Sequence, residues 1–359
     1  MDSKSRHQIP VFRWHPGSNL HWLVLCDHAS NKIPGPLNDL GLSPFDLTRH
    51  IACDLGAVDV ARRIARALKA PMIEHGISRL VIDPNRSRDD PTLIPEVSDG
   101  TLTPGNQGLT QSERERRWRV YHQPYHRRID RHLKQMAMTS MVPLVLSIHS
   151  FTPMLADTRE PRPWSVGVLW RHDPTFAHHL IRELSRDGVV VGDNQPYDGH
   201  LAMGHTVDHH AIQRGLPYTM IELRQDQIST PAARAQWAAR LYRALMRTSA
   251  HFRPRAQHLA PGAWTPETPI GRLPGGKPES QRYEDSAGRE GDPRQPADAA
   301  LETRRLGPGS GLRLDERVDR CRSIDGALSG EGARRPGGRP GGPSRLAVRG
   351  GVCRFAARR

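Results

Sequence analysis

The sequence predicts an α/β fold in which helices cover a mixed or largely parallel sheet. Short, continuously apolar runs recur along the chain, as expected for strands that are buried on both faces. Amphipathic stretches with helical spacing lie between these runs. Strands that alternate with helices are typical of α/β layers, so the two observations together predict this class.

The candidate strands are five to seven residues long, a usual length for a strand. In chain order they are residues 21–26, 71–76, 79–83, 143–149, 164–170, 188–193 and 218–223. The candidate helices are residues 54–70, 112–137, 174–188 and 230–252.

The helices carry recognisable signals. Leu55, Ile64 and Leu68 belong to one apolar stripe of the first helix. The second helix has a helical pattern on both sides of Pro124. Asp173-Pro174 is a typical helix start, because a capping side chain precedes a proline at the first helical position, and Thr230-Pro231 begins the last helix similarly.

The composition divides the chain into two parts. Of the net charge of +14, residues 253–359 carry +8, and the same segment holds 30 glycines and prolines without a helical or strand period. We therefore expect a catalytic domain over residues 1–252 and a disordered Arg/Gly/Pro-rich tail over 253–359. Arginine-rich tails can bind nucleic acid, but this one lacks interleaved aromatic residues for stacking, so we expect no nucleic-acid partner.

The chain has four cysteines with no CxxC pair, no apolar leader at its start and no run of 18 apolar residues. These features predict a cytoplasmic protein in a reducing compartment, without a membrane partner.

Four predicted strands end in residues that carry chemistry. The ends are Asp27-His28-Ala29-Ser30-Asn31, Asp83-Pro84-Asn85-Arg86, His149-Ser150-Phe151 and Glu222-Leu223-Arg224. Open α/β sheets place their sites beyond the carboxyl ends of the strands, so we expect these residues to converge.

The side chains at these ends fit a metallohydrolase. His28 and His149 can bind a zinc-like divalent ion that keeps a third ligand and an open position. Such an ion activates water and polarises a carbonyl. Glu222 can accept the proton of the water and pass it to a leaving nitrogen, and Arg86 can grip a substrate carboxylate. The parts suit cleavage of an amide in a small acidic substrate.

Each part also has a structural interpretation. A histidine after a strand can cap backbone groups, and Asp27 can either orient His28 or cap the loop. Glu222 and Arg224 alternate with apolar residues and can form the solvent face of an edge strand. Residues 83–86 are a good turn sequence whatever their function. The combination of the four ends favours the site.

At these residues the chain resembles a known family. The stretches "DHASNKIP", "DLGAVDVARRIA", "SRLVIDPNR", "YHQPYHRRI", "LSIHSFTP", "GDNQPYDG" and "IELRQD" resemble the N-formylglutamate amidohydrolase family, in its order, over about residues 20–245. The resemblance implies a three-layer α/β/α sandwich, phosphorylase/hydrolase-like and related to zinc carboxypeptidases. It also implies hydrolysis of an N-acyl amino acid, N-formylglutamate to glutamate and formate, with a divalent metal ion for which zinc is expected.

The resemblance assigns roles to individual residues. His28 and His149 take the metal-binding positions, Glu222 that of the catalytic glutamate, and Asn85-Arg86 that of the pair that holds the substrate carboxylate. Carboxypeptidase-like relatives have a His-x-x-Glu spacing, whereas here Asn31 stands in the last position. Either Asn31 is a weak metal ligand, or the third ligand lies elsewhere, or Asn31 binds the substrate.

A rival metal pair is His122 and His126, which are spaced to face one way on a helix. Gln123 stands where the familiar zinc helix has a glutamate, and Pro124 disturbs the geometry. Because "YHQPYHRRI" belongs to the family pattern, we expect its central residues to line or brace the pocket, and we place His126 and Arg224 among the substrate-binding residues. The other candidates, which can instead be structural or cap a helix, are Tyr125, Arg127, His205 and Thr206.

A non-catalytic hypothesis competes with the enzyme. A carboxylate- or nucleic-acid-binding protein could retain the fold and use Arg86 and the basic tail. Asn31 in place of a glutamate supports this alternative, whereas the four strand ends favour the hydrolase.

Overall fold

The computed structural model describes residues 9–139, 142–155, 159–201 and 203–251. The predicted tail, residues 253–359, lies outside the described residues. Within them, no helix combines the length and the apolar character needed to cross a membrane.

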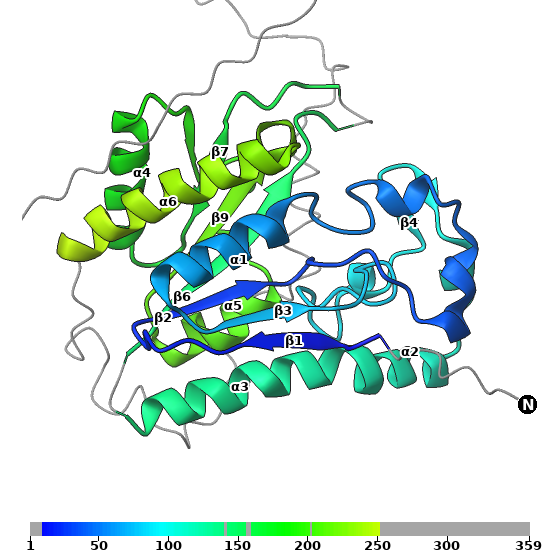
Figure 1. The fold of residues 1–359 in the computed structure, drawn as a ribbon. Helices are drawn as coiled ribbons and strands as arrows, with labels where there is room; N and C mark the ends of the chain where they lie inside the picture. The colour runs from blue at the N-terminus through cyan, green and yellow to red at the C-terminus, as the bar shows by residue number, and fades with distance from the viewer. Residues whose placement is uncertain (1–8, 140–141, 156–158, 202, 252–359) are drawn as a thin grey trace, which may run out of the picture. The chain divides into compact units, whose positions relative to one another are not determined.

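A seven-stranded mixed sheet lies at the centre of the fold, in the order β1-β3-β2-β6-β9-β7-β8 (Figure 1). Strands β3, β2, β6 and β9 are parallel, whereas β1 at one edge and β7 next to β9 are antiparallel to their neighbours. The strands are β1 Phe12–His15, β2 Trp22–Cys26, β3 Met72–His75, β6 Leu144–Phe151, β7 Val166–Leu169, β8 Val191–Asp193 and β9 Tyr218–Arg224.

Helices cover both faces of this sheet, which gives three layers (Figure 1). One face packs against α1 Ala57–Leu68, α4 Thr175–Arg186 and α6 Pro231–His251, and the other against α3 Gln123–Ala137 and α5 His205–His210. The residues of β2 show why its run is apolar throughout. Trp22 and Val24 lie in the core under α1, while Leu23 and Leu25 lie in the core under α3, because successive side chains of a strand point to opposite faces. The predicted α/β/α class is confirmed.

The predicted helix 112–137 consists of three consecutive pieces. They are α2 Gln111–Arg117, the π-helical turn η5 Trp118–His122, and α3. Pro124 lies in the first turn of α3, and the preceding π turn is closed by the Gln123 amide donating to the Trp118 carbonyl. A wider turn of this kind tolerates the missing N–H of proline and is frequent at functional sites.

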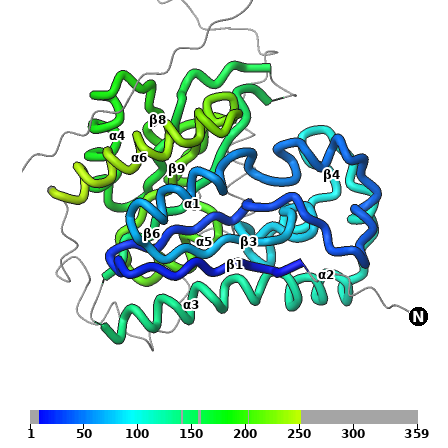
Figure 2. Tube along the Cα trace, in the orientation of Figure 1, coloured from blue at the N-terminus to red at the C-terminus, as the bar shows by residue number. Residues whose placement is uncertain are grey.

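The connections after β2 and β3 extend from the same end of the sheet and pack together (Figure 2). They contain a small hairpin, β4 Val97–Ser98 and β5 Thr101–Leu102, whose loop binds Arg49 from the other connection. The remaining short helices are η1 Gly35–Gly41, η2 Asp46–Thr48, η3 Pro91–Leu93, η4 Pro104–Asn106, η6 Ile212–Arg214 and η7 Gln225–Ile228.

One predicted strand, residues 79–83, is wrong. These residues form turns. The Val81 amide donates to the Ser78 carbonyl, and the Asp83 amide donates to the Leu93 carbonyl. Arg79 also forms an ion pair with Asp83, four residues along. The apolar residues between them are buried in a separate cluster outside the sheet, so a buried loop satisfies the run as well as a strand would. No sequence pattern indicated β1.

Candidate active site

Three side chains meet beyond the carboxyl ends of β2 and β6. His28 follows β2, His149 lies near the end of β6, and Asp54 stands just before α1. All three are buried, and one ligand atom from each lies within 4.8 Å of the others. The Asp54 carboxylate lies 3.3 Å from His28 Nδ1 and 2.8 Å from His149 Nδ1. We call these residues the His–Asp–His cluster.

Oxygen atoms behind the two imidazoles fix their orientation. His28 Nε2 donates to Asp83 Oδ1 at 2.7 Å, and His149 Nε2 lies 3.1 Å from Ser147 Oγ. These contacts aim Nδ1 of each ring at Asp54, and because a carboxylate only accepts, each Nδ1 carries a hydrogen here and would release it to bind an ion. The cluster is therefore already arranged as a ligand set.

Asp27 supports His149 and not His28, its neighbour in the sequence. Its Oδ2 lies 3.3 Å from His149 Nε2, and its Oδ1 accepts a 2.7 Å hydrogen bond from the Tyr125 hydroxyl of α3. Burial and the charge of Asp27 raise the pKa of Tyr125, so this phenol stays a neutral donor. Tyr125 thus braces the site from the opposite layer.

The cluster balances buried charges of both signs. Burial lowers the pKa values of His28 and His149, but Asp54 and the carboxylates behind each imidazole outweigh it and raise both. Burial likewise disfavours the ionised carboxylate of Asp54, but the two imidazoles hold its pKa below the ordinary range. Removing either sign would leave an uncompensated buried charge.

Glu222 stands beside this cluster. It lies on β9 in register with His149 on β6, so both side chains leave the same face of the sheet. Among the described residues, Glu222 Oε2 is buried without a hydrogen-bond partner. Burial raises the pKa of Glu222 to about 7; His149 opposes this rise and Asp54 adds to it. A carboxyl group that titrates near neutrality suits proton transfer.

A cavity of about 140 Å³ opens over these groups. Five predicted site residues line it: His28, Asn85, Arg86, His149 and Glu222. The other lining residues are Asp54, Arg79, Ser150, Leu169, Tyr197, Met203, Gly204 and Met220. The residues predicted from three separate strand ends and one turn therefore converge.

The turn that carries Asn85 and Arg86 is held by the start of α5. Asn85 Oδ1 accepts from the Thr206 amide at 3.0 Å, and the Asn85 carbonyl accepts from the His205 amide at 3.0 Å. Gly204 has φ +81°, and a Cβ atom there would clash with the Asn85 carboxamide. Thr206, predicted as a pocket or capping residue, therefore helps to position Asn85.

Three predicted site residues lie elsewhere. Asn31 is exposed, and its side-chain amide donates to the Leu47 carbonyl at 2.8 Å. Arg224 is paired with Asp226 at 2.8 Å. His126 faces the Pro84 carbonyl and other histidines. None of the three is among the residues that line the cavity.

Asp54 is the cluster residue that sequence reasoning missed. It belongs to the quoted stretch "DLGAVDVARRIA", but an aspartate just before a helix is usually a capping residue. In the structure its amide donates to the His28 carbonyl at 3.0 Å, which brings the two residues together. The rival pair, His122 and His126, also meets, together with His205.

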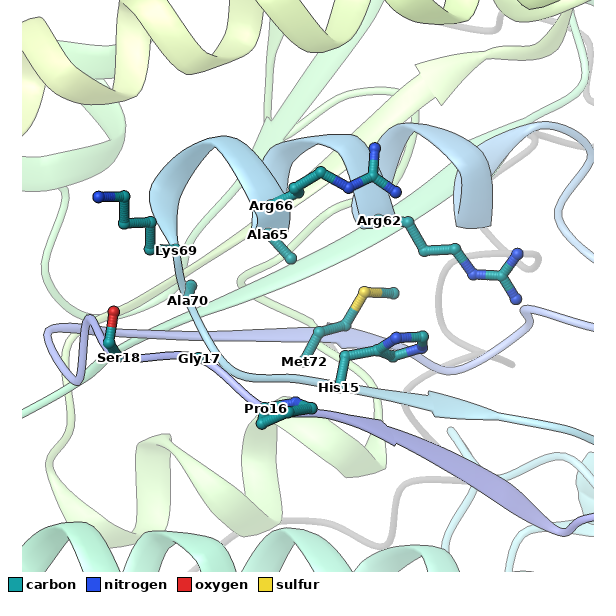
Figure 3. A pocket seen from close by; sticks show the side chains of 10 residues that line it. All are labelled: His15, Pro16, Gly17, Ser18, Arg62, Ala65, Arg66, Lys69, Ala70 and Met72. Atoms are coloured by element: carbon teal, nitrogen blue, oxygen red, sulfur yellow. The ribbon is translucent and has the colours of Figure 1, made fainter.

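A larger cavity, about 440 Å³, lies between β1 and α1 (Figure 3). Its charged lining is basic, and Arg62 is committed to a 2.7 Å hydrogen bond with Glu74. Its ten lining residues include no carboxylate and a single imidazole, that of His15. The larger volume therefore does not identify the site, because the groups that could bind a metal ion or transfer a proton line the smaller cavity.

Known proteins resemble this chain over the same region. The sequence pattern of the family described as N-formylglutamate amidohydrolase matches residues 20–229. A gene product of Agrobacterium tumefaciens with a solved structure is 30% identical, with a TM-score of 0.63, over 67% of this chain and 95% of that chain. N-formylglutamate amidohydrolase from Ralstonia eutropha JMP134 is 21% identical, with a TM-score of 0.55, over 67% and 97%, a likeness that shows the fold. No curated protein matches.

Proposed function

Because the chain belongs to the N-formylglutamate amidohydrolase family, and is thus an amidohydrolase, we propose that it hydrolyses a small N-acyl amino acid such as N-formylglutamate. In this proposal the enzyme uses a divalent metal ion, and Glu222 is the general base. The observation that carries it is the convergence of the His–Asp–His cluster, Glu222 and Arg86 on one cavity. Family membership decides against the non-catalytic alternative.

The His–Asp–His cluster fits a divalent ion by its donor set. His28 Nδ1, His149 Nδ1 and an Asp54 oxygen would hold it, and two imidazoles with one carboxylate are a usual set for catalytic zinc. A bound ion supplies Lewis acidity, which activates water and polarises an amide carbonyl. Asp83 and Ser147, which accept hydrogen bonds from the Nε2 atoms, would keep the ligands oriented.

Arg86 and Asn85 would bind the substrate carboxylate. Both line the cavity, and a planar guanidinium can grip a carboxylate through two parallel hydrogen bonds. Arg79, a second lining cation, forms an ion pair with Asp83 and lies 3.6 Å from Asp54, so it serves the cluster instead. The small cavity suits a small acidic substrate better than a polymer.

Glu222 would move the proton. Its unpartnered oxygen can accept a proton from the attacking water, whose oxygen forms a bond to the acyl carbon. The same carboxyl group then donates that proton to the amide nitrogen as the C–N bond breaks. Because its pKa is raised to about 7, both protonation states are accessible near neutrality. For N-formylglutamate the products are formate and glutamate.

We assign this activity to residues 1–252, since the family match ends at residue 229. The test uses the full-length protein and measures release of the free amino acid from N-formylglutamate, N-acetylglutamate and N-formylleucine. We expect hydrolysis of N-formylglutamate, loss of the rate after a chelator, and recovery with Zn²⁺. A chelated protein that contains no divalent ion and keeps its full rate would contradict the metal mechanism.

A further inference from the structure

A second group of histidines lies where α3 meets α5, behind the turn that carries Asn85 and Arg86. His122, His126 and His205 each offer one ring nitrogen, and these atoms lie within 4.8 Å of one another. His122 and His126 are buried, whereas His205 is partly exposed. We call these three residues the imidazole cluster.

Backbone carbonyls fix the tautomers of the two buried rings. His122 Nε2 lies 3.0 Å from the Arg86 carbonyl, and His126 Nε2 lies 2.9 Å from the Pro84 carbonyl. A carbonyl oxygen only accepts, so each Nε2 carries the hydrogen and each Nδ1 presents a lone pair. An imidazole that binds a metal usually donates its other N–H in this way.

The lone pair of His122 has nothing to bind. His122 Nδ1 is buried and has no hydrogen-bond partner among the described residues, and the side chain is only 1% exposed. Trp118 stacks on the ring with centroids 3.8 Å apart, which prevents it from turning toward solvent. A buried acceptor without a partner costs free energy, so it indicates an occupant at this position.

We propose that the imidazole cluster is a second divalent-cation site, in which His122, His126 and His205 bind an ion such as Zn²⁺. An all-nitrogen set favours zinc, copper or nickel over magnesium and calcium, which prefer oxygen. His126 Nδ1 lies 2.9 Å from His210 Nε2 and would exchange this hydrogen bond for the ion. His205, the partly exposed member, gives the ion access from solvent.

The electrostatics of the cluster suit neutral ligands. Burial and the neighbouring His205 lower the pKa of His122 to about 3, and burial and His209 lower that of His205 to about 4. Neutral imidazole is the form that binds metal. An ion there would stiffen the Pro84–Arg86 turn through His122 and His126, without taking part in the reaction. This inference does not rest on the proposed function.

The test counts bound zinc in the full-length protein after equilibration with Zn²⁺ and removal of the excess. We expect two equivalents in the natural protein, one in His149→Ala, one in His205→Ala and none in the double variant. His205→Ala is the cleanest probe, because its backbone N–H still donates to Asn85. The control is His209→Ala on the same helix, which is outside the three-residue group and should keep two equivalents.

Cobalt substitution gives a second measurement that does not depend on activity. We expect the visible absorption of Co²⁺ to fall in His205→Ala and to persist in part in His149→Ala. If His205→Ala binds as much zinc and cobalt as the natural protein, the second site does not exist. If bound zinc falls by one equivalent in His205→Ala but does not change in His149→Ala, the result supports the second site and contradicts the metal in the proposed function. His205→Gln, with the thermal unfolding of both variants in chelator, separates lost binding from lost folding.

Discussion

The His–Asp–His cluster and the imidazole cluster use the same side chain in opposite electrostatic settings. In the first, carboxylates contact both imidazoles and raise the pKa values of His28 and His149. In the second, burial and neighbouring histidines lower the pKa values of His122 and His205 to about 3 and about 4. The comparison teaches that the partners of a histidine, and not the residue itself, decide its charge.

One turn connects the two clusters. The Asp83 side chain holds His28 of the first cluster, while the carbonyls of Pro84 and Arg86 accept from His126 and His122 of the second. Asn85 and Arg86, which line the cavity, lie between these anchors. A change in either cluster should therefore alter substrate binding through this turn, and variants confined to one cluster separate the two contributions.

The largest effect should come from Glu222→Gln, which removes the proton-transferring group beside the His–Asp–His cluster and leaves both clusters unchanged. We expect kcat to fall by about 10²–10⁴-fold, because general acid–base catalysis contributes on that order. Bound metal and substrate affinity should be retained. Initial rates with metal analysis provide the measurement, and a variant with near-normal kcat would remove Glu222 from the mechanism.

Asp83→Asn should weaken metal binding at the first cluster by about 10–100-fold, the usual cost of changing a residue that orients a metal ligand. The amide oxygen can still accept from His28, but the amide nitrogen cannot accept from Arg79, so the variant removes the charge together with the Arg79 ion pair. Asp226→Asn, which affects only the exposed contacts with Arg224 and Gln227, is the matched control. Competition with a chelator measures the affinity, and equal loss from both clusters would show a general disturbance.

Arg86→Lys should raise KM by about 10-fold while kcat changes less, because lysine keeps the charge but loses the planar fork. The backbone carbonyl of residue 86 still accepts from His122, so the second cluster is preserved. Arg224→Lys tests the sequence prediction that Arg224 binds substrate. Since Arg224 does not line the cavity, we expect its KM to be unchanged.

The smallest effect is a pH dependence of stability. Burial and Arg214 lower the pKa of His209, beside the imidazole cluster, to about 4, whereas the unfolded chain titrates near about 6.5. Between these values the unfolded state binds more protons, so the free energy of unfolding decreases as the pH falls. The raised pKa values of His28 and His149 have the opposite sign, since their contribution is lost as the pH rises through the folded pKa.

His209→Gln should therefore reduce the loss of stability on acidification by about 1 kcal/mol at about pH 5, after a discount for partial exposure. Urea unfolding of the chelated protein near pH 5 and near pH 7.5 measures the difference. An unchanged difference between the two pH values would show that His209 is not buried neutral.

The sequence anticipated the parts of the fold that depend on local pattern. The apolar runs that became β2, β3, β6, β7 and β9 are buried on both faces, and such runs are visible without any partner. The run at 79–83 has the same composition, but Arg79 and Asp83 close it into a turn. Strand β1 contains charged and half-buried residues, so the hydrophobic pattern of the sequence did not predict its pairing with β3.

The candidate site shows the same division. His28 follows an apolar strand, and His149 and Glu222 lie near the carboxyl ends of two others, so the rule that sites lie at these ends was enough to select them. Asp54 looked like a helix cap, and only its approach to both imidazoles distinguishes it. Asn31 was predicted as a site residue from the His-x-x-Glu spacing of relatives, but its side-chain amide donates to the Leu47 carbonyl.

By itself the sequence determined the α/β class, the family and five of the residues that line the cavity, because these follow from hydrophobic period and from short local motifs. The tertiary structure alone decided which carboxylate meets the two imidazoles, that Asp27 serves His149, and that three histidines from η5, α3 and α5 converge. Most of these contacts join residues that are far apart in the sequence, such as His28 with Asp54, 26 positions apart, and His149 with Asp54, 95 positions apart. Side-chain direction and distance across layers set them, and no local pattern encodes either.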